Sequence, residues 1–286
     1  MPEPALLAIC GSISADYIGY GPKLPGPGES VLGDRLLIAP GGKGANVAVA
    51  AARLGARVRF HGARGADANG TLIGDALAAE GIDTSALEVL ADVPSGVALI
   101  CVDERGENQI LALAGANGRV GAPAPCGAKV WFCPGEIPRA AHVGTIAAAR
   151  TDGAIVVINA SPTHAVDASL LPQFDLAIVN EGELQAFAES LPPRVVVTRG
   201  AKGVVVLPGG PELPAPPAKV RDTTGAGDAF AGGVCAGLAE GRSLEHAIRL
   251  ALVAAAISVE RDGCQPSYPT RAEVERRNGL NGVRRS

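Results

Sequence analysis

Short apolar runs alternate with alanine-rich stretches along most of the chain. The runs Leu6–Cys10, Ile155–Asn159 and Val195–Thr198 are almost wholly apolar, which is typical of strands covered by helices on both faces of a sheet. The alanine-rich stretches Ala45–Leu54 and Leu72–Glu80 favour helices. This alternation predicts an α/β fold with a central, mostly parallel sheet flanked by helices. The other predicted strands are Val58–Gly62, Val97–Val102, Val130–Cys133, Leu176–Val179 and Gly203–Leu207.

Two regions, Gly19–Ala39 and Ser95–Leu113, break this rhythm. The first is rich in Pro and Gly, and the second has apolar runs on both sides of the polar turn Glu104–Glu107, which is typical of a β-hairpin. We therefore predict a small β lid formed by about residues 14–40 and 95–115.

The C-terminal third is predicted to be mostly helical. Its pattern from Ala226 to Val259 is interrupted at Gly241–Ser243, where Ser243 is expected to cap a second helix. No internal repeat is present, and we predict a single domain covering residues 1–286.

Composition adds limits on partners and compartment. The chain has 286 residues, of which 47% are apolar, so it can bury a large core. Its formal charge of −4, with Lys and Arg scattered along the chain, provides no basic surface for nucleic acid or a membrane. The six cysteines form no CxxC pair, and the N-terminus has Glu3 before a short apolar run, which predicts neither a signal peptide nor a spanning helix. We expect a cytoplasmic protein.

The segment Asp222–Phe230, with the sequence DTTGAGDAF, is a glycine-rich turn that leads into a predicted helix. Free N–H groups at a helix N-terminus, together with glycines that allow close approach, favour binding of a phosphate. Asp228 lies close enough to that anion hole to accept a proton from a hydroxyl group. The alternative is an ordinary N-cap aspartate.

A second glycine turn, Gly41–Asn46, also opens a predicted helix. Its sequence GGKGAN lacks the GxxxxGK[ST] pattern of a P-loop, so Lys43 and Asn46 are better interpreted as binders of hydroxyl groups. The alternative is a tight turn that only packs against the sheet.

A third segment, Gly11–Asp16, follows the first predicted strand. It places the Asp16 carboxylate where ligands bind in open α/β sheets, and one carboxylate can accept two adjacent hydroxyl protons. The alternative is an Asx turn. The segment has no GxGxxG pattern, which argues against an oxidoreductase with a dinucleotide-binding fold.

Two weaker segments follow later strands. Asn180–Glu183 has an amide and two acids that can hold Mg²⁺ through water, but it is also typical of a helix start. The other segment is Thr198–Gly203. It can be interpreted as part of a binding site or, alternatively, as a hairpin turn.

Taken in this order, the motifs resemble the ribokinase-like sugar kinases, also called the pfkB family, from Cys10 to Pro269. The resemblance rests on GSISAD, GGKGAN and DTTGAGDAF, and it implies a three-layer fold with a small β lid. It also implies ATP-dependent transfer of the γ-phosphoryl group to a primary hydroxyl, with D-ribose as the expected acceptor. A kinase of another sugar or of a nucleoside, or a non-catalytic sensor of a sugar or nucleotide, remains an alternative.

The resemblance also assigns roles to individual residues. Asp228 would be the base, beside an anion hole of Gly225, Ala226 and Gly227. The residues implied to hold the sugar are Ser14, Asp16, Gly42, Lys43, Gly44, Ala45, Asn46 and Glu136, together with Asp228. Those implied to contact the nucleotide are Asn180, Thr198, Arg199, Gly200, Ala201, Lys202 and Gly203, with Gly227 and Asp228.

Two cations are implied as well. Glu183 would position Mg²⁺ through water, and a monovalent cation, expected to be K⁺, would lie beside the anion hole. The positions implied to hold it are Asp222, Thr224, Ser258, Arg261, Gly263 and Ser267. By the same resemblance, the lids of two copies are expected to pair into a homodimer.

The chain departs from the pattern of the family at three places. Ser14 and Val47 stand where the family usually has Asn and Gln, and the segment between Asn180 and Thr198 is shorter by about one helix. The first two departures bear on the choice of substrate, and the third bears on the outer nucleotide side.

Overall fold

The computed structural model describes residues 5–277 and residue 279. The predicted domain of residues 1–286 therefore extends past the described residues at both ends, and Glu3 lies outside them. None of the helices in the described part of the chain is both long enough and apolar enough to cross a bilayer. All six cysteines, which are all described, have free thiols.

A nine-stranded sheet forms the centre of the molecule, in the order β13-β12-β11-β10-β9-β8-β1-β4-β5. Neighbouring strands are parallel, except that β12 runs antiparallel to both β11 and β13. The strands are β1 (Leu6–Cys10), β4 (Arg57–Gly65), β5 (Asp83–Leu90), β8 (Val130–Pro134), β9 (Ile155–Asn159), β10 (Leu176–Asn180), β11 (Val195–Thr198), β12 (Val204–Leu207) and β13 (Glu212–Leu213).

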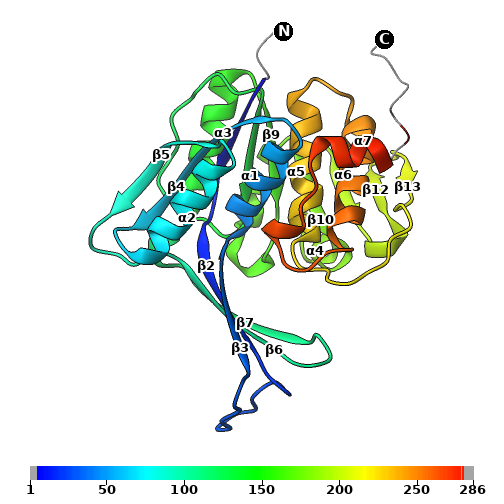
Figure 1. Ribbon diagram of the computed structural model, residues 1–286. Helices are drawn as coiled ribbons and strands as arrows, with labels where there is room; N and C mark the ends of the chain where they lie inside the picture. The colour runs from blue at the N-terminus through cyan, green and yellow to red at the C-terminus, as the bar shows by residue number, and fades with distance from the viewer. Residues whose placement is uncertain (1–4, 278, 280–286) are drawn as a thin grey trace.

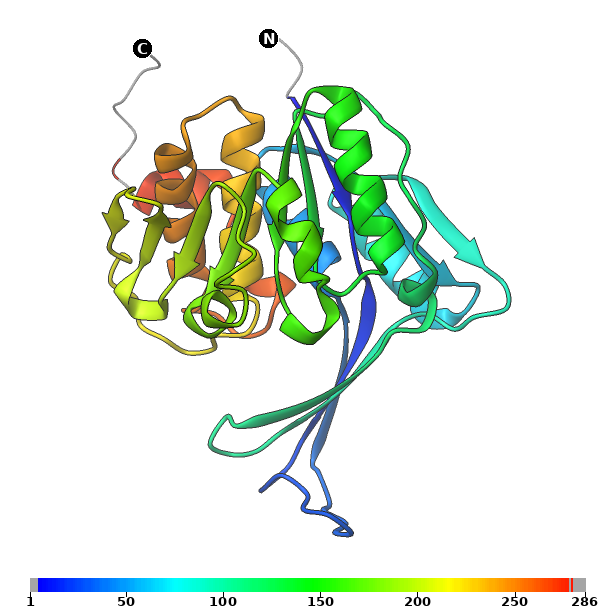
Figure 2. The ribbon, with the colours of Figure 1, turned by 180° about the vertical axis from the view of Figure 1, so that it is seen from behind.

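Helices cover both faces of this sheet, as Figures 1 and 2 show from opposite sides. Alternation along β1 divides the core, since Leu7 and Ile9 join one cluster of buried side chains while Ala8 and Cys10 join the other. The first cluster packs under α1 (Lys43–Arg53), α2 (Ala68–Ala79), α5 (Ala226–Ala239), α6 (Leu244–Ser258) and α7 (Arg271–Arg277).

The second cluster lies under α3 (Arg139–Asp152), α4 (Glu181–Ala186) and a set of short 3-10 helices. The 3-10 helices of the chain are η1 (Gly115–Arg119), η2 (Thr163–Ala165), η3 (Ala168–Gln173), η4 (Gly200–Lys202) and η5 (Gln265–Ser267). The prediction of a three-layer α/β fold with a mostly parallel sheet is confirmed.

The lid is a second sheet of four strands in the order β3-β2-β6-β7. It consists of β2 (Ser14–Tyr20), β3 (Arg35–Gly41), β6 (Val97–Val102) and β7 (Asn108–Leu113). It projects away from the three layers in both views (Figures 1 and 2). β6 and β7 form the predicted antiparallel hairpin.

The edge strand β5 and the helix α3 were not among the predicted elements. β5 has the mixed sequence DTSALEVL because it pairs only with β4 and much of it is exposed, so it lacks a continuous apolar run. The predicted loop 208–218 contains the short strand β13. Ser243 caps α6 as predicted, accepting a hydrogen bond from the backbone N–H of His246.

Candidate active site

The candidate site lies where the carboxyl ends of parallel strands meet the first turns of two helices. Segments that follow β1, β8, β10 and β11 leave the sheet at this edge, because these strands all run in one direction. They carry the polar motifs identified in the sequence, and such an edge is where ligands bind in open α/β sheets.

The first helix, α1, begins at a closely packed glycine turn. Gly42 has a φ of 92°, and a Cβ added to it would lie 2.6 Å from the Cα of Ile13. The backbone N–H of Ala45 donates to the carbonyl of Ser12 at 3.0 Å, and the N–H of Gly44 is directed at the Ser12 hydroxyl at 3.4 Å. The backbone of this turn therefore packs against the segment after β1, which agrees with the alternative interpretation of a tight, packed turn. The contribution of Gly44 and Ala45 to sugar binding stays a prediction.

The second helix, α5, begins at a glycine turn with free amides. Gly225 has a φ of 74°, and a Cβ on it would lie 2.3 Å from the Sγ of Cys264. Among the described residues, no acceptor is bonded to the N–H groups of Gly225, Gly227 and Asp228. These amides point out of the positive end of the helix dipole, so the turn can receive an anionic group.

Asp228 lies inside the first turn of α5, and Gly225 is the N-cap. The interpretation of Asp228 as an ordinary N-cap is therefore wrong. Its Oδ2 instead accepts a hydrogen bond of 2.9 Å from Nδ2 of Asn46, across the two helix starts. A carboxylate held beside free amides has the geometry of a general base next to an anion hole.

Four further side chains, those of Lys43, Glu136, Ser12 and Asp16, join Asn46 and Asp228. Nζ of Lys43 lies 3.6 Å from Oε1 of Glu136, and the hydroxyl of Ser12 donates to the other oxygen of Glu136 at 2.6 Å. Asp16 influences Asp228 through its charge. The fold thus gathers three carboxylates, an ammonium group, a carboxamide and a hydroxyl group, all of which can bind hydroxyl groups.

Asp16 is part of β2, so the alternative of an Asx turn is wrong. Its Oδ1 accepts a hydrogen bond of 2.6 Å from the hydroxyl of Ser14. Its carboxylate lies directly against Gly41, where a Cβ would be 2.1 Å from Oδ2. Gly41 is therefore needed to leave room for the carboxylate.

Burial changes the protonation of this cluster. It raises the pKa of the Asp228 carboxyl group to about 6, although the charge of Lys43 and the hydrogen bond from Asn46 oppose the rise. It also raises the pKa of Asp16 to about 6, against the hydrogen bond from Ser14. Burial alone would lower the pKa of Lys43, but the charges of Asp228 and Glu136 raise it above its usual value. Lys43 therefore stays charged at neutral pH.

The predicted nucleotide side starts at two adjacent strand ends, since Asn180 of β10 pairs in register with Thr198 of β11. Asn180 and Glu183 form a capping box at the start of α4, so the interpretation as a helix start is correct. The segment after Thr198 forms the turn between the antiparallel strands β11 and β12, so the alternative interpretation as a hairpin turn is also correct. Arg199 pairs with Glu212, and its Nε is buried without a hydrogen-bond partner among the described residues.

The residues implied for Mg²⁺ fit a site that binds the ion through water. Glu183 uses Oε2 to accept the N–H of Asn180, which leaves Oε1 available. Its charge also contributes to the raised pKa of Lys43. Magnesium keeps several waters and needs few direct protein ligands.

The residues implied for a monovalent cation come together from two distant segments. Asp222 joins them, since Oδ1 accepts the N–H of Thr224 and Oδ2 accepts the N–H of Gly263, both at 2.8 Å. Among the described residues, the carbonyl oxygens of Asp222, Thr224 and Gly263 have no donor, and such oxygens suit K⁺. The other implied positions, Ser258, Arg261 and Ser267, lie on the second of these segments.

Two residues of the site were not singled out from the sequence. Ser12 binds Glu136, and Gln265 donates through Nε2 to Oδ1 of Asn46 at 3.0 Å. Both contacts join positions far apart in the chain, 124 and 219 residues respectively. No local pattern in the sequence signals such pairs.

Free amides at a helix start, a base beside them and neighbouring hydroxyl binders define an enzyme that transfers an anionic group to a hydroxyl. The model of the family "pfkB family carbohydrate kinase" matches residues 4–271 of the chain. The chain therefore belongs to the pfkB family of carbohydrate kinases and is a phosphotransferase that acts on an alcohol group.

Individual relatives agree with this assignment. The chain is 35% identical to a ribokinase of Haemophilus influenzae, over 94% of this chain and 96% of that protein. The structure of Arabidopsis thaliana ribokinase complexed with ribose and ATP superposes with a TM-score of 0.86 at 29% identity, covering 95% of this chain and 98% of that one. A nucleoside kinase of Burkholderia thailandensis in complex with inosine gives a TM-score of 0.84 at 26% identity, covering 97% and 98%.

Proposed function

We propose that this protein transfers the γ-phosphoryl group of ATP to the primary hydroxyl of D-ribose, forming ribose 5-phosphate. The observation that carries the proposal is the start of α5, where the amides of Gly225 and Gly227, which have no acceptor in the described part of the chain, lie beside the Asp228 carboxylate. The similarity to ribokinases over nearly the whole chain supports ribose as the acceptor.

In this proposal each group of the chain has a separate task. Asp16, Lys43 and Asn46 hold the sugar hydroxyls, and Asp228 accepts the proton of the primary hydroxyl as it attacks. The amides at the start of α5 stabilise the charge on the phosphoryl group during transfer. Asn180 and the segment Thr198–Gly203 hold the nucleotide.

The proposal includes two cations. Bound Mg²⁺ would neutralise phosphate charge near Glu183, and K⁺ would be held by carbonyl oxygens at Asp222, Thr224 and Gly263. Replacing K⁺ by tetramethylammonium at constant ionic strength should lower turnover, and Asp222→Ala should make turnover insensitive to the exchange. Equal rates in both salts for the unaltered protein would contradict the K⁺ site.

The test of the activity is ADP release with MgATP and KCl against D-ribose, 2-deoxyribose, fructose, fructose phosphates, adenosine and pseudouridine. We expect the highest kcat/KM with D-ribose. Faster turnover of a nucleoside or another sugar would keep the kinase and change the acceptor. Stabilisation by ligands without any ADP release would instead favour the sensor.

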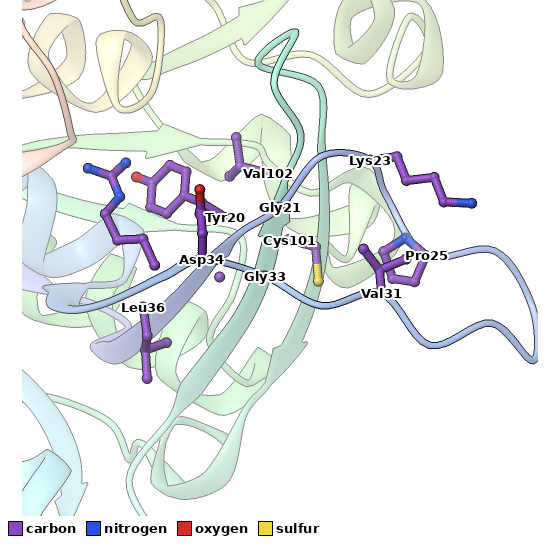
Figure 3. Close-up of a pocket in the computed structure, with 12 residues that line it drawn as sticks. Tyr20, Gly21, Lys23, Pro25, Val31, Gly33, Asp34, Leu36, Cys101 and Val102 are labelled. Atoms are coloured by element: carbon purple, nitrogen blue, oxygen red, sulfur yellow. The ribbon is translucent and has the colours of Figure 1, made fainter.

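We also propose that two copies pair through their lids. Large apolar side chains are exposed on three lid strands, including Leu36 at 63%, Ile110 at 60% and Leu111 at 58%, and such patches usually mark interfaces. Near them a hollow of about 460 Å³ is lined by lid residues such as Tyr20, Val31 and Cys101 (Figure 3). Arg35 stacks on the Tyr20 ring at 3.6 Å.

Light scattering after size-exclusion chromatography tests the pairing. We expect a dimer that Leu111→Lys converts to monomer, while the control Glu104→Lys in the hairpin turn stays dimeric. A monomer for the unaltered chain would contradict lid pairing.

We also propose that the protein is cytoplasmic. The free thiols on all six cysteines support this compartment.

A further inference from the structure

Two carboxamides stand in line behind the candidate base. Asn46 donates through Nδ2 to Asp228 at 2.9 Å and accepts through Oδ1 from Nε2 of Gln265 at 3.0 Å. Asn46 and Gln265 are each only 6% exposed. The contact between Gln265 and Asn46 is therefore shielded from competing water, and the line runs from η5 through α1 to α5.

The chemistry of the three groups permits only one arrangement of this line. A carboxylate accepts hydrogen bonds and cannot donate, so Asp228 requires the nitrogen of the Asn46 carboxamide on its side. The Asn46 oxygen must then face away, toward a donor. Gln265 supplies that donor, and a buried oxygen left without it would lose a hydrogen bond that water cannot replace.

Gln265 is itself firmly attached to the helix that carries Asn46. Its carbonyl accepts a hydrogen bond of 2.6 Å from Nη1 of Arg53, at the other end of α1. The same guanidinium donates to the carbonyl of Tyr268 at 3.0 Å and binds the Glu80 carboxylate. The side chain of Gln265 thus projects from a turn, η5, that is attached to α1 by hydrogen bonds at two of its carbonyl groups.

From this arrangement we infer that Gln265 is a positioning residue of the kinase: it holds the Asn46 carboxamide with its N–H toward Asp228, which keeps the base ionised and aligned. Gln265 touches neither reactant and acts only through Asn46. The inference rests on the proposed function, in which Asp228 is the base.

The groups around Asp228 show why the orientation of one amide matters. Its own burial, and then the charges of Glu136 and Asp16, disfavour its ionised form, whereas the Lys43 charge and the Asn46 N–H favour it. If the carboxamide turned over, its oxygen would face the carboxylate and add to the repulsion. The titratable groups that interact with Asp228 from the surrounding elements are Asp16, Lys43, Glu136, Cys264 and Tyr268.

Two substitutions separate positioning from packing. Gln265→Met keeps the length but removes the donor, and Gln265→Glu replaces the donor by an acceptor that draws the Asn46 N–H away from Asp228. The variants are assayed for kcat/KM between pH 5 and pH 9 with MgATP, D-ribose and saturating KCl, so that a weaker cation site is not limiting. Gln173→Glu, an exposed position on η3, is the matched control.

We expect Gln265→Met to lower kcat/KM at neutral pH about tenfold, the size expected when a buried acceptor loses its partner. The acidic limb of its pH profile should move upward by roughly half a pH unit, because the ionised base loses an oriented donor. Gln265→Glu should give larger changes in the same directions, and Gln173→Glu should give none. In an Asn46→Ala background, Gln265→Met should have no further effect on the limb.

An acidic limb that stays in place in both variants would overturn the inference, as would equal shifts with and without Asn46. Failure of the proposed function has a different signature, since the unaltered protein would then release no ADP. In that case the inference is tested by following the ¹³C carboxyl resonance of Asp228 as a function of pH. The titration midpoint of this resonance should still move upward in Gln265→Met. An unmoved midpoint would overturn the inference independently of activity.

Discussion

Helices α1 and α5 both begin after a glycine of positive φ, 92° at Gly42 and 74° at Gly225, and neither start has a side-chain cap. The α1 turn is packed against the loop after β1, and its amides at Gly44 and Ala45 point at Ser12. In the α5 turn the N–H of Ala226 donates to the carbonyl of Thr223, but the amides of Gly225, Gly227 and Asp228 are unbonded among the described residues. The same local motif thus supports side chains in one case, and in the other it leaves amides free to receive an anionic group.

The first turns also carry opposite charges. α1 presents Lys43 and has no acid in its first turn, whereas α5 presents Asp228. A cation at a helix N-terminus is disfavoured by the dipole, and burial disfavours it too, but the raised pKa of Lys43 indicates that Asp228 and Glu136 outweigh the burial. The two starts therefore depend on each other, and each of the following predictions alters one of them.

The largest effect is expected from the base on α5. Asp228→Asn should lower kcat by roughly 10²–10⁴-fold, the range for loss of a general base. Steady-state ADP release measures it, with Glu245→Gln in the first turn of α6 as a control that should change nothing. Near-normal turnover in Asp228→Asn would remove the carboxylate from the chemistry.

The two glycine turns can be compared directly by one substitution in each. A Cβ added at Gly227 would meet no atom within 4 Å from the rest of the described chain outside its own helix turn. A Cβ added at Gly44 would lie 2.7 Å from the Cα of Gly11. Gly227→Ala should therefore fold normally yet lower kcat on the order of 100-fold, since the methyl group displaces the phosphoryl group. Gly44→Ala should cost roughly 1–3 kcal/mol of stability through overpacking.

Urea unfolding and ADP release on both variants test this contrast. A stable, fully active Gly227→Ala would mean that the α5 turn holds no phosphoryl group. An unaffected unfolding midpoint in Gly44→Ala would mean that the α1 turn is not as tightly packed as its contacts indicate.

The pH profile should show the shared burial of the two acids. Asp16 and Asp228 must both be ionised to accept hydroxyl protons, and burial raises the pKa of each to about 6. Activity should therefore fall below pH 6 by about tenfold or more per pH unit, with more than one proton taken up. Initial rates from pH 4.5 to pH 8 measure the limb, and a limb near pH 4 would contradict the burial of these carboxyl groups.

The smallest effect concerns stability. The folded-state pKa of Asp228, about 6, lies above that of an unfolded aspartate, so the carboxyl group stabilises the fold when protonated at low pH and this contribution is lost as pH rises through 6. Asp228→Asn avoids the buried charge, so it should be more stable than the unaltered protein at pH 8 by about 1 kcal/mol after solvent screening. Urea titrations at pH 4 and pH 8 should show the gain only at the higher pH.

Much of the fold could be predicted because its signals are local. The apolar runs of β1, β9 and β11 coincide with the predicted strands, since burial on both faces demands apolar side chains at successive positions. β5 has one exposed flank and therefore a mixed pattern, so it was missed. α3 begins at Arg139 after Pro138 and was also missed, although buried alanines fill its inner face.

The candidate site was predictable where one short segment contains the chemistry. Gly225 and Asp228 lie within a single turn, so spacing alone relates the predicted anion hole to the proposed base. Asp16 was expected in the segment after the first strand, and its position within β2 was not predicted, because the turn and strand alternatives differ only in the tertiary contacts of the lid.

The sequence by itself determined the two glycine turns, the polar residues inside them and the order of strands and helices, because backbone conformation and periodicity act over a few neighbouring residues. The tertiary structure alone decided that Asn46 meets Asp228 across 182 positions and that Gln265 meets Asn46 across 219. It also decided the raised pKa of Asp16 and Asp228, because burial exists only once distant segments have packed together.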